Sequence, residues 1–342
     1  MNKKPATIKE IARQLNVSIS TVSRALHDHP SIGLRTRMQV QKLARELQYE
    51  RNQAAVSFKQ GKTATIGVIL PRFSEEFFSA VISGIEDFAV SNKYNVLIGQ
   101  SYDEMDREQQ IVETMRNSRV DGLLVSVAKN TTSYDHFDRL ANYNIPIVFF
   151  DCIPNRPVQA SVSCNLHQGT VQGVAFLANR KHKHIALLNG PQQLQASHQR
   201  EQAYMQGLKE NDLTVNPALM VRTNLTKEGT QAAIDELLKA KPQPTAIVAF
   251  NDYVALEAMH YLRHKKIKIN QDISFVSFAH LPLCNYLDNP PLASVEQFPY
   301  EQGYKAMEML YNIITQTDKQ NASTQIVLES TLVETNIAEF RD

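Results

Sequence analysis

The chain has 342 residues, which is longer than a typical single domain and predicts two or three domains. It is 43% hydrophobic and 21% charged, a composition ordinary for a globular protein with a substantial core. The net charge of +1 conceals an asymmetry: residues 1–62 hold 12 Lys and Arg against 4 Asp and Glu, and the rest hold 24 against 31. Residues 1–62, which contain the segment called the head below, therefore carry a net charge of +8, and the remaining residues, called the body, carry −7. This asymmetry favours a nucleic-acid-binding segment over a randomly lysine-rich tail.

Cysteine use and hydropathy exclude several other classes. Cys152, Cys164 and Cys284 lie far apart without CxxC spacing, which argues against a disulfide framework and a structural zinc site and fits a reducing cytoplasm. No apolar run reaches the ~18 residues that a membrane helix needs. The start, MNKKPATIKE, lacks the apolar core of a signal peptide. We therefore expect a cytoplasmic protein without a membrane segment.

Residues 7–26, TIKEIARQLNVSISTVSRAL, have the pattern of a helix-turn-helix. The first half repeats apolar residues at i, i+3, i+4 and i+7, and Thr7 with Glu10 forms a capping box. Asn16 suits a tight turn, and Ser18 is a candidate N-cap of the second helix. In this arrangement the second helix can lie in a DNA major groove.

The outward residues of that second helix suit contacts with DNA. Hydroxyls near its start can bind phosphates, and Arg24 can bind guanine O6 and N7 with two hydrogen bonds. A structural helix pair with solvated polar residues is the alternative interpretation. The predicted DNA-contacting residues of the head are Thr7, Ser18, Ile19, Ser20, Thr21, Ser23, Arg24 and His27.

After the head, residues 35–49 predict a third helix whose apolar stripe closes a small core. Residues 51–60, RNQAAVSFKQ, form a short, weakly amphipathic piece that is marginal as an isolated helix.

From Thr65 the pattern changes to alternating strands and helices. Near-continuous apolar strands in such an alternation indicate parallel sheets covered on both faces, and two series of them imply two lobes. The predicted fold class is therefore α/β, with an all-α head. The expected strands are 66–70, 94–99, 121–127, 145–151, 184–190, 246–250 and 273–278. The expected helices are 75–92, 104–117, 133–143, 166–180, 195–210, 227–240 and 251–265, followed by a helix near 300–315 and a strand near 324–334.

Three motifs of other chemistry are rejected. Gly61-Lys62-Thr63 resembles the end of a P-loop, but Val56 stands where the first glycine is needed and no strand precedes it. Residues 181–184, KHKH, have no third ligand nearby and are more typical of a solvated turn than of a metal site. No G-x-S-x-G elbow is present. We expect no cofactor, no metal and no catalytic residues.

Several motifs together resemble those of the lactose/galactose repressor family of bacterial transcription regulators. The segment 7–12 matches the family's T-[IL]-x-[DE]-[IV]-A, and VSISTVSRAL matches its second helix, with Ile19, Ser20 and Arg24 at the base-reading positions. In the body, SEEFF, RVDG, Asn251-Asp252 and LCNYLDNPPLASV follow in the family's order. His27 replaces the usual Asn, and Gly33 replaces a Ser or Asp.

The resemblance implies a domain organisation. The body would share its fold with periplasmic sugar-binding proteins. The piece after the head would be a hinge that folds into a helix when two subunits dock on DNA. Phe58 stands where the family has a Leu that acts as a minor-groove wedge, which Phe is able to replace; a disordered linker with an incidental Phe is the alternative. The expected parts are a head at 1–49, a hinge at 50–63 and a core at 64–342, with one lobe at about 64–163 and 294–335 and the other at about 164–293.

Polar residues follow several strands at the carboxyl ends, where parallel sheets bind ligands. Arg and Asp together bind polyols well, and Phe rings can stack on a sugar or base. Arg200 is included by resemblance to the family's R-x-x-[AG]-[FWY], and His280 because Ala279 replaces an Asp that often binds ligand in the family. A structural capping role is the alternative for Asp151 and Asp252. The predicted effector-binding residues are Arg72, Phe77, Phe78, Ser126, Asp151, Arg200, Asn251, Asp252 and His280.

These observations predict a sequence-specific DNA-binding transcription regulator, a repressor rather than an enzyme. The expected partners are a two-fold symmetric operator, a second copy of the chain, and a sugar or sugar derivative, including anionic ones that suit Arg72 and Arg200. No heptad repeat follows Glu339, which favours a dimer over a tetramer. The alternative is a solute receptor, which would need a signal peptide, or an enzyme, which would need a catalytic constellation.

Overall fold

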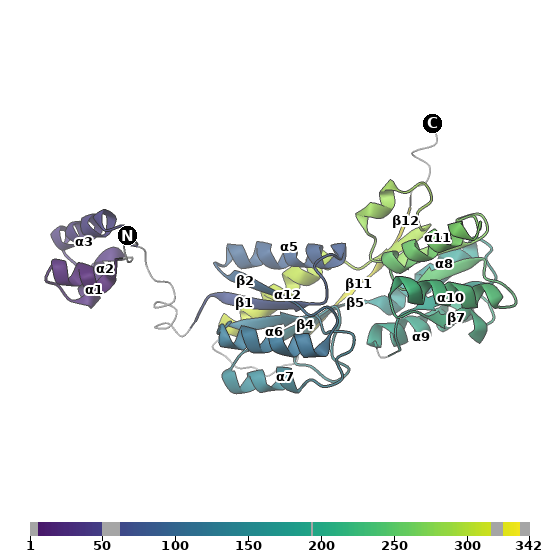
Figure 1. The fold of residues 1–342 in the computed structure, drawn as a ribbon, viewed down its shortest axis with the longest axis horizontal. Coiled ribbons are helices and arrows are strands. Elements are labelled where there is room, and N and C mark those ends of the chain that lie inside the picture. The colour runs from purple at the N-terminus through teal and green to yellow at the C-terminus, as the bar shows by residue number, and fades with distance from the viewer. Residues whose placement is uncertain (1–5, 50–61, 193, 316–323, 336–342) are drawn as a thin grey trace. The chain divides into compact units, whose positions relative to one another are not determined.

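The computed structural model describes residues 6–49, 62–192, 194–315 and 324–335. The chain divides into two compact units, Met1–Thr63 and Ala64–Asp342, and the second spans the same residues as the expected core (Figure 1). Phe58 and most of the expected hinge lie outside the described residues. No helix of the described part is long and apolar enough to cross a membrane.

The described residues of the first unit form three helices, α1 (Ile8–Gln14), α2 (Ile19–Leu26) and α3 (Leu34–Glu46). The helices close around a small core because each contributes a short apolar stripe. The expected third helix is confirmed, although it ends three residues earlier than the pattern suggested, at Glu46. The buried core residues are Ile11, Ala12, Val22, Ala25, Val40 and Ala44.

The starts of α1 and α2 are capped by side chains, as the sequence predicted. Thr7 Oγ1 accepts a hydrogen bond from the Glu10 N–H at 3.3 Å, and Ser18 Oγ accepts one from the Thr21 N–H at 3.0 Å. Between the helices, Asn16 has a φ of 50°, the left-handed conformation that Asn adopts at low cost. These three residues set the helix-turn-helix geometry locally.

The part of the second unit that the structure describes contains two six-stranded sheets. The first has the order β11-β5-β4-β3-β1-β2 and is entirely parallel. The second has the order β12-β10-β9-β8-β6-β7, parallel except for β12. The first sheet comprises β1 (Thr65–Leu70), β2 (Asn95–Gln100), β3 (Gly122–Val125), β4 (Ile147–Phe150), β5 (Ala160–Asn165) and β11 (Thr324–Glu329). The second comprises β6 (Ile185–Asn189), β7 (Met220–Arg222), β8 (Ala246–Ala249), β9 (Ser274–Phe278), β10 (Ala293–Glu296) and β12 (Thr331–Glu334).

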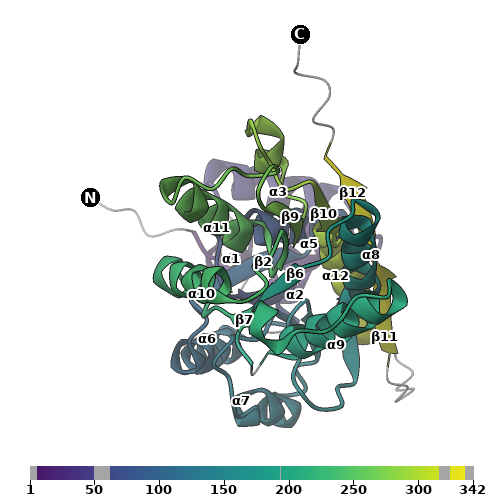
Figure 2. The ribbon, with the colours of Figure 1, turned by 90° about the vertical axis from the view of Figure 1, so that its right-hand side faces the viewer.

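Helices cover both faces of each sheet. The helices of the first lobe are α5 (Glu76–Ser91), α6 (Met105–Asn117), α7 (Asp135–Asp138) with the 3₁₀ turn η1 (Arg139–Tyr143), and α12 (Pro299–Thr315). Those of the second are α8 (Leu166–Asn179), α9 (Gln195–Glu210), α10 (Lys227–Lys239) and α11 (Asp252–His264), with the short turns η2 (Pro217–Leu219) and η3 (Pro282–Tyr286). In the second lobe, α10 and α11 lie on one side of the sheet and α8 and α9 on the other (Figure 2).

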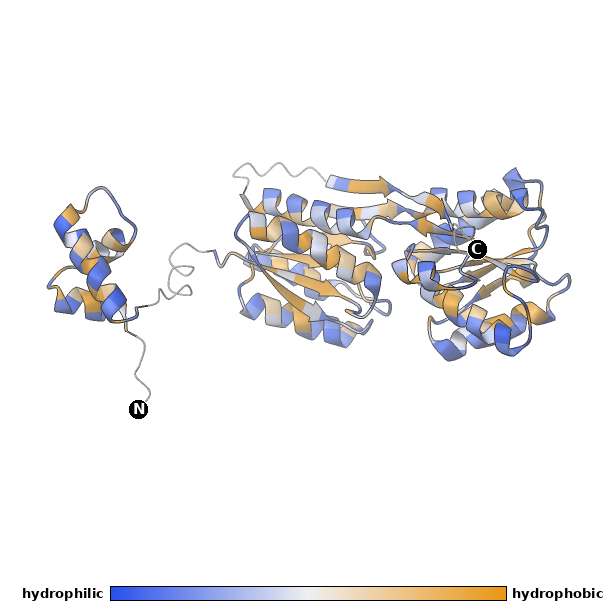
Figure 3. Ribbon diagram, turned by 90° about the horizontal axis from the view of Figure 1, so that it is seen from above, coloured by the Kyte–Doolittle hydropathy of each residue, from blue (hydrophilic) through white to orange (hydrophobic). Residues whose placement is uncertain are grey.

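Alternation along the strands explains the continuous apolar runs. In β6, Ala186 and Leu188 pack toward α10 and α11, whereas Ile185 and Leu187 pack toward α8 and α9. A strand in the middle of such a sandwich is apolar at every position because both of its faces are buried. Figure 3 shows the result, with hydrophobic strands inside and hydrophilic helix faces outside.

The lobes exchange strands in a way that the sequence did not predict. Residues 294–335 were expected in the first lobe, but β10 and β12 pair in the second sheet. The expected single strand at 324–334 is therefore two strands, β11 in the first sheet and β12 in the second. Between them, buried Ser330 donates a hydrogen bond from Oγ to the Asn165 carbonyl at 2.7 Å. Hydrogen bonding thus joins two of the three segments that cross between the lobes.

Candidate DNA-binding face and effector cleft

The predicted DNA-contacting residues lie on the outside of the head. Ile19, Ser20 and Arg24 are exposed, and Ile19 shows 46% of its surface although it is a large apolar residue. An exposed Ile at the start of a recognition helix suits contact with a thymine methyl group, and Arg24 suits a guanine. The helix therefore presents one apolar and one cationic side chain together.

The remaining residues of this face have contacts of their own. Ser18 Oγ lies 2.7 Å from Ser20 Oγ and 2.8 Å from Thr21 Oγ1, in addition to capping the helix. His27 Nδ1 lies 2.6 Å from the Ser23 carbonyl oxygen, so the imidazole caps the end of α2. These contacts orient the hydroxyl groups and the imidazole ring before any contact with DNA. Thr7, at the start of α1, is also exposed.

Arg200 on α9 is the most unusual group of the core. It is 3% exposed, and its Cζ lies 4.2 Å from the centroid of the Phe250 ring and 4.3 Å from that of Phe278. Its Nε and Nη1 atoms have no hydrogen-bond partner among the described residues. Burial lowers the pKa of Arg200 to about 10. A buried cation with unpaired donors is costly unless a ligand supplies acceptors.

Asp151 of the first lobe interacts electrostatically with this guanidinium. It follows β4 with a φ of 54° and accepts a hydrogen bond from Ser126 Oγ at 3.2 Å. Burial raises the pKa of Asp151, while hydrogen bonds from Cys152 and Ser126 and the charges of Arg200 and Lys129 act in the opposite direction. Asp151, Ser126 and Arg200 were predicted from the sequence, and Asp151 interacts with both of the others. Of the nine predicted effector residues, Asp151 alone is among those that line the cleft described next.

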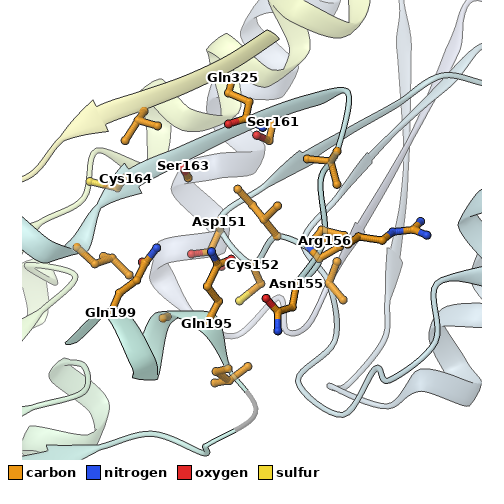
Figure 4. Close-up of a pocket in the computed structure, with 18 of the residues that line it drawn as sticks. Asp151, Cys152, Asn155, Arg156, Ser161, Ser163, Cys164, Gln195, Gln199 and Gln325 are labelled. Carbon is orange, nitrogen blue, oxygen red and sulfur yellow. The ribbon is translucent and has the colours of Figure 1, made fainter. Parts of the chain in front are cut away.

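A cleft of about 460 Å³ opens beside Asp151 and is lined by both lobes (Figure 4). In Figure 4, Gln195 and Gln199 of α9 lie opposite Asp151 and Cys152. The sequence analysis missed these two amides. Their signal was available, because positions i and i+4 at the start of a helix that follows a buried strand share one face at the carboxyl edge of the sheet. Further polar lining residues are Lys129, Asn155, Arg156, Ser161, Ser163 and Gln325.

Arg72 lies in a cluster of mixed charge. Its Nε is 3.7 Å from Asp103 Oδ2, an atom that also accepts from Lys129 Nζ at 2.8 Å. Burial raises the pKa of Glu75, with the nearby charges of Asp103 and Asp151 in the same direction and those of Lys129 and Arg72 opposing it. The charge of Arg72 is therefore offset by the carboxylate of Asp103, within the first lobe.

Phe77 and Phe78 are packed in the core of the first lobe. They are 8% and 4% exposed, and their rings meet edge to face with centroids 5.2 Å apart. Both belong to the cluster that contains Val68, Leu124 and Met307. The described contacts account for them as core residues, and no stacking face on a ligand is needed to explain them.

Asp252 is fully buried and satisfied by the protein itself. Its Oδ1 accepts from Ser277 Oγ and from Ser294 Oγ, the latter at 2.9 Å, and its Oδ2 accepts from the Leu281 N–H at 2.7 Å. Burial raises the pKa of Asp252, and these hydrogen bonds oppose that rise. Its contacts support the structural role that the sequence analysis left as the alternative. Asn251 is the N-cap of α11, since its Oδ1 accepts from the Val254 N–H at 2.9 Å.

His280 stands in a strained loop beside this network. Ala279 has a φ of 96° and His280 a φ of 50°, so two successive residues adopt backbone conformations that L-residues rarely enter. The His280 N–H donates to Ser294 Oγ at 2.9 Å, which fixes the turn. Such strain is retained where surrounding contacts over-determine the backbone, often beside a binding site.

A helix-turn-helix head and a two-lobed ligand-binding core define a ligand-responsive transcription regulator. The chain matches the model of periplasmic binding proteins and the sugar binding domain of the LacI family over residues 63–335, and that of bacterial regulatory proteins of the lacI family over residues 7–52. The chain therefore belongs to the LacI family of bacterial regulatory proteins, whose members are DNA-binding transcription regulators with a ligand-binding core.

Similar proteins agree with this assignment. The chain is 30% identical to the transcriptional repressor CytR of Escherichia coli K12, covering 89% of each sequence. It is 29% identical to catabolite control protein A of Priestia megaterium, covering 94% of this chain and 95% of that protein. Its fold is similar to that of the Lac repressor dimer bound to operator and the anti-inducer ONPF, with a TM-score of 0.81 at 22% identity, covering 97% of this chain and 98% of that one.

Proposed function

We propose that the chain is a cytoplasmic repressor without enzymatic activity, which binds a two-fold symmetric operator as a homodimer and is controlled by a small molecule held between its lobes. The exposed Ile19 and Arg24 of α2 support operator recognition. CytR is a repressor by name, and the Lac repressor of similar fold forms a dimer on its operator. A helix-turn-helix dimer binds half-sites related by its own symmetry, so the operator is a palindrome.

The proposal that the core binds an effector rests on the unpaired hydrogen-bond donors of buried Arg200. A ligand oxygen that accepts from Nε and Nη1 would relieve the cost of burying that cation. Asp151 lines the cleft from the first lobe, interacts electrostatically with Arg200 and can accept hydrogen bonds from a ligand. This pairing suits a sugar or sugar derivative whose hydroxyls donate to Asp151 and whose oxygen atoms, neutral or anionic, accept from Arg200.

Selection of bound sequences from random duplex DNA tests the DNA-binding part. The wild-type chain should recover two-fold symmetric sites. Arg24→Ala should weaken binding by about 1–3 kcal/mol and relax specificity at one base pair of each half-site, because the bidentate contact to guanine is lost. Lys93→Ala, an exposed change in the core unit, is the control and should leave the selected site unchanged. Recovery of asymmetric single sites only, or of no preferred sequence, would contradict the dimeric repressor.

A further inference from the structure

Two exposed histidines lie one turn apart near the end of α11. His260 and His264 are four residues apart, a spacing that places both side chains on the same face of a helix. Their Nε2 atoms are 3.1 Å apart, and their ring centroids are 4.6 Å apart at an interplanar angle of 82°. Both side chains are exposed, and neither lines the cleft of the proposed effector. The sequence analysis did not single out this pair.

The two nitrogen atoms are at hydrogen-bond distance from each other, and this separation also fits a shared metal ion that takes the place of the shared proton. Imidazole nitrogen binds Zn²⁺ at about 2.0–2.1 Å. Two such bonds that meet at an angle between square and tetrahedral geometry place the nitrogen atoms about 2.9–3.4 Å apart. The 3.1 Å observed between His260 Nε2 and His264 Nε2 falls within this range. The helix backbone therefore already holds both ligands at the required spacing.

We propose that His260 and His264 chelate one divalent transition-metal ion through their Nε2 atoms, with water in the remaining positions. Two His at i and i+4 on one helix face are also how helical zinc motifs present a pair of imidazoles. Within the described part of the chain no group of three or more His, Cys, Asp or Glu side chains could hold a metal. The site is therefore bidentate and open to solvent. Residues 181–184 also lack a third ligand, but there His182 Nδ1 already contacts Thr245 Oγ1 at 3.0 Å, whereas the Nε2 atoms of His260 and His264 face each other.

Two cationic residues are close to the histidine pair in sequence. Arg263 is exposed between the two histidines in sequence, and Lys265 follows them. The Lys265 Nζ is held 2.8 Å from Asp235 Oδ1 on α10 and 4.8 Å from the centroid of the Tyr261 ring, so its charge is engaged away from the pair. A positive charge close in sequence disfavours all divalent cations alike. Sites with nitrogen ligands bind Cu²⁺ more tightly than Ni²⁺ or Zn²⁺, so we expect this pair to prefer Cu²⁺.

Titration of the untagged full-length chain with Cu²⁺ tests the proposal. We expect a saturable rise in melting temperature, because an ion that binds the preformed pair favours the folded state. The electron paramagnetic resonance spectrum of the Cu²⁺ complex should show two nitrogen ligands at one ion per chain. His260→Ala and His264→Ala should each weaken binding by at least about tenfold, because each removes one of the two ligands.

Two further variants separate this site from other histidines. His184→Ala removes one member of the His182-Lys183-His184 segment, and it should leave Cu²⁺ binding unchanged. His264→Gln keeps a polar side chain of similar length and should lose binding as His264→Ala does, with the fold intact by circular dichroism. If His260→Ala and His264→Ala retain the wild-type titration and spectrum, or if His184→Ala loses them, the ion binds elsewhere and the proposal is wrong.

Discussion

Asp252 and Arg200 are both buried charges in the core, but the protein treats them in opposite ways. The Asp252 carboxylate has three donors from the protein, whereas Arg200 has two aromatic rings and unpaired donor atoms. A satisfied buried charge is a structural element, while an unsatisfied one marks the place of a missing partner. From residue type and position in the sequence, Asp252 and Arg200 were equally good candidates for binding the effector. Only their contacts in the structure distinguish the two.

The structural role of Asp252 can be measured. Asp252→Asn replaces one acceptor oxygen by an amide donor, which conflicts with at least one of the donors from Ser277, Ser294 and the Leu281 backbone. We expect the free energy of unfolding, from urea titration, to fall by about 1–3 kcal/mol. The matched control Asp288→Asn changes an exposed carboxylate close by in sequence and should have little effect. Equal stability of the two variants would show that the network is not structural.

At the scale of elements, the strands with both faces buried were predictable and the crossing strands were not. The runs that became β1 and β6 are apolar at all but one terminal position, so their assignment followed from composition alone. β5, with the sequence ASVSCN, alternates polar and apolar residues and lies next to the cleft, so it gave no such signal. Whether β11 and β12 join one sheet or two depends on pairing with distant strands, which no local pattern reports.

The loop after β3 is organised by one buried carboxylate. Glu108 on α6 is fully buried, and its oxygens accept from the Ala128 N–H at 2.7 Å, from Thr131 Oγ1 at 2.7 Å and from His136 Nε2 at 3.0 Å. Ala128 and Thr131 line the cleft. A side chain outside the cleft therefore fixes part of its wall, which apolar periodicity along α6 could not reveal.

We expect Glu108→Ala to leave these donors without acceptors and to lower the free energy of unfolding by at least about 2 kcal/mol. Amide hydrogen exchange in residues 127–136 should accelerate more than exchange in the second lobe, because the loop loses its anchor. Glu113→Ala on the same helix removes an exposed carboxylate and should leave exchange in the loop unchanged. A uniform acceleration across both lobes would indicate global destabilisation instead of local anchoring.

At the scale of the core unit, the cleft beside Asp151, where we propose that the effector binds, lies among contacts between the two lobes. The Glu76 N–H at the start of α5 donates to the Tyr253 hydroxyl at the start of α11 at 3.0 Å, which joins the two lobes directly. Asp151 and Arg200 also come from different lobes. A ligand that binds both residues favours one interlobe arrangement, and it can shift the equilibrium only by its difference in affinity for the two arrangements.

This coupling predicts the behaviour of Arg200 variants with a ligand panel. Free and phosphorylated sugars, nucleosides and nucleobases would be screened by melting temperature, since a ligand of the folded state raises it. For any compound that stabilises the wild type, Arg200→Ala should abolish the shift, because acceptor atoms of the ligand lose their donors. Arg263→Ala, which removes an exposed guanidinium, should retain the shift.

Ala279 supplies a test of ligand charge within the same screen. Ala279 already has a φ of 96°, and Asp enters positive φ more readily than most residues, so Ala279→Asp adds no new backbone conflict. It restores the carboxylate that family members often carry, and it should weaken an anionic ligand by like-charge repulsion while sparing or improving a neutral polyol. A compound whose stabilisation of the wild type survives Arg200→Ala unchanged would show that the effector does not bind at this guanidinium. The unpaired donors of Arg200 would then need another explanation.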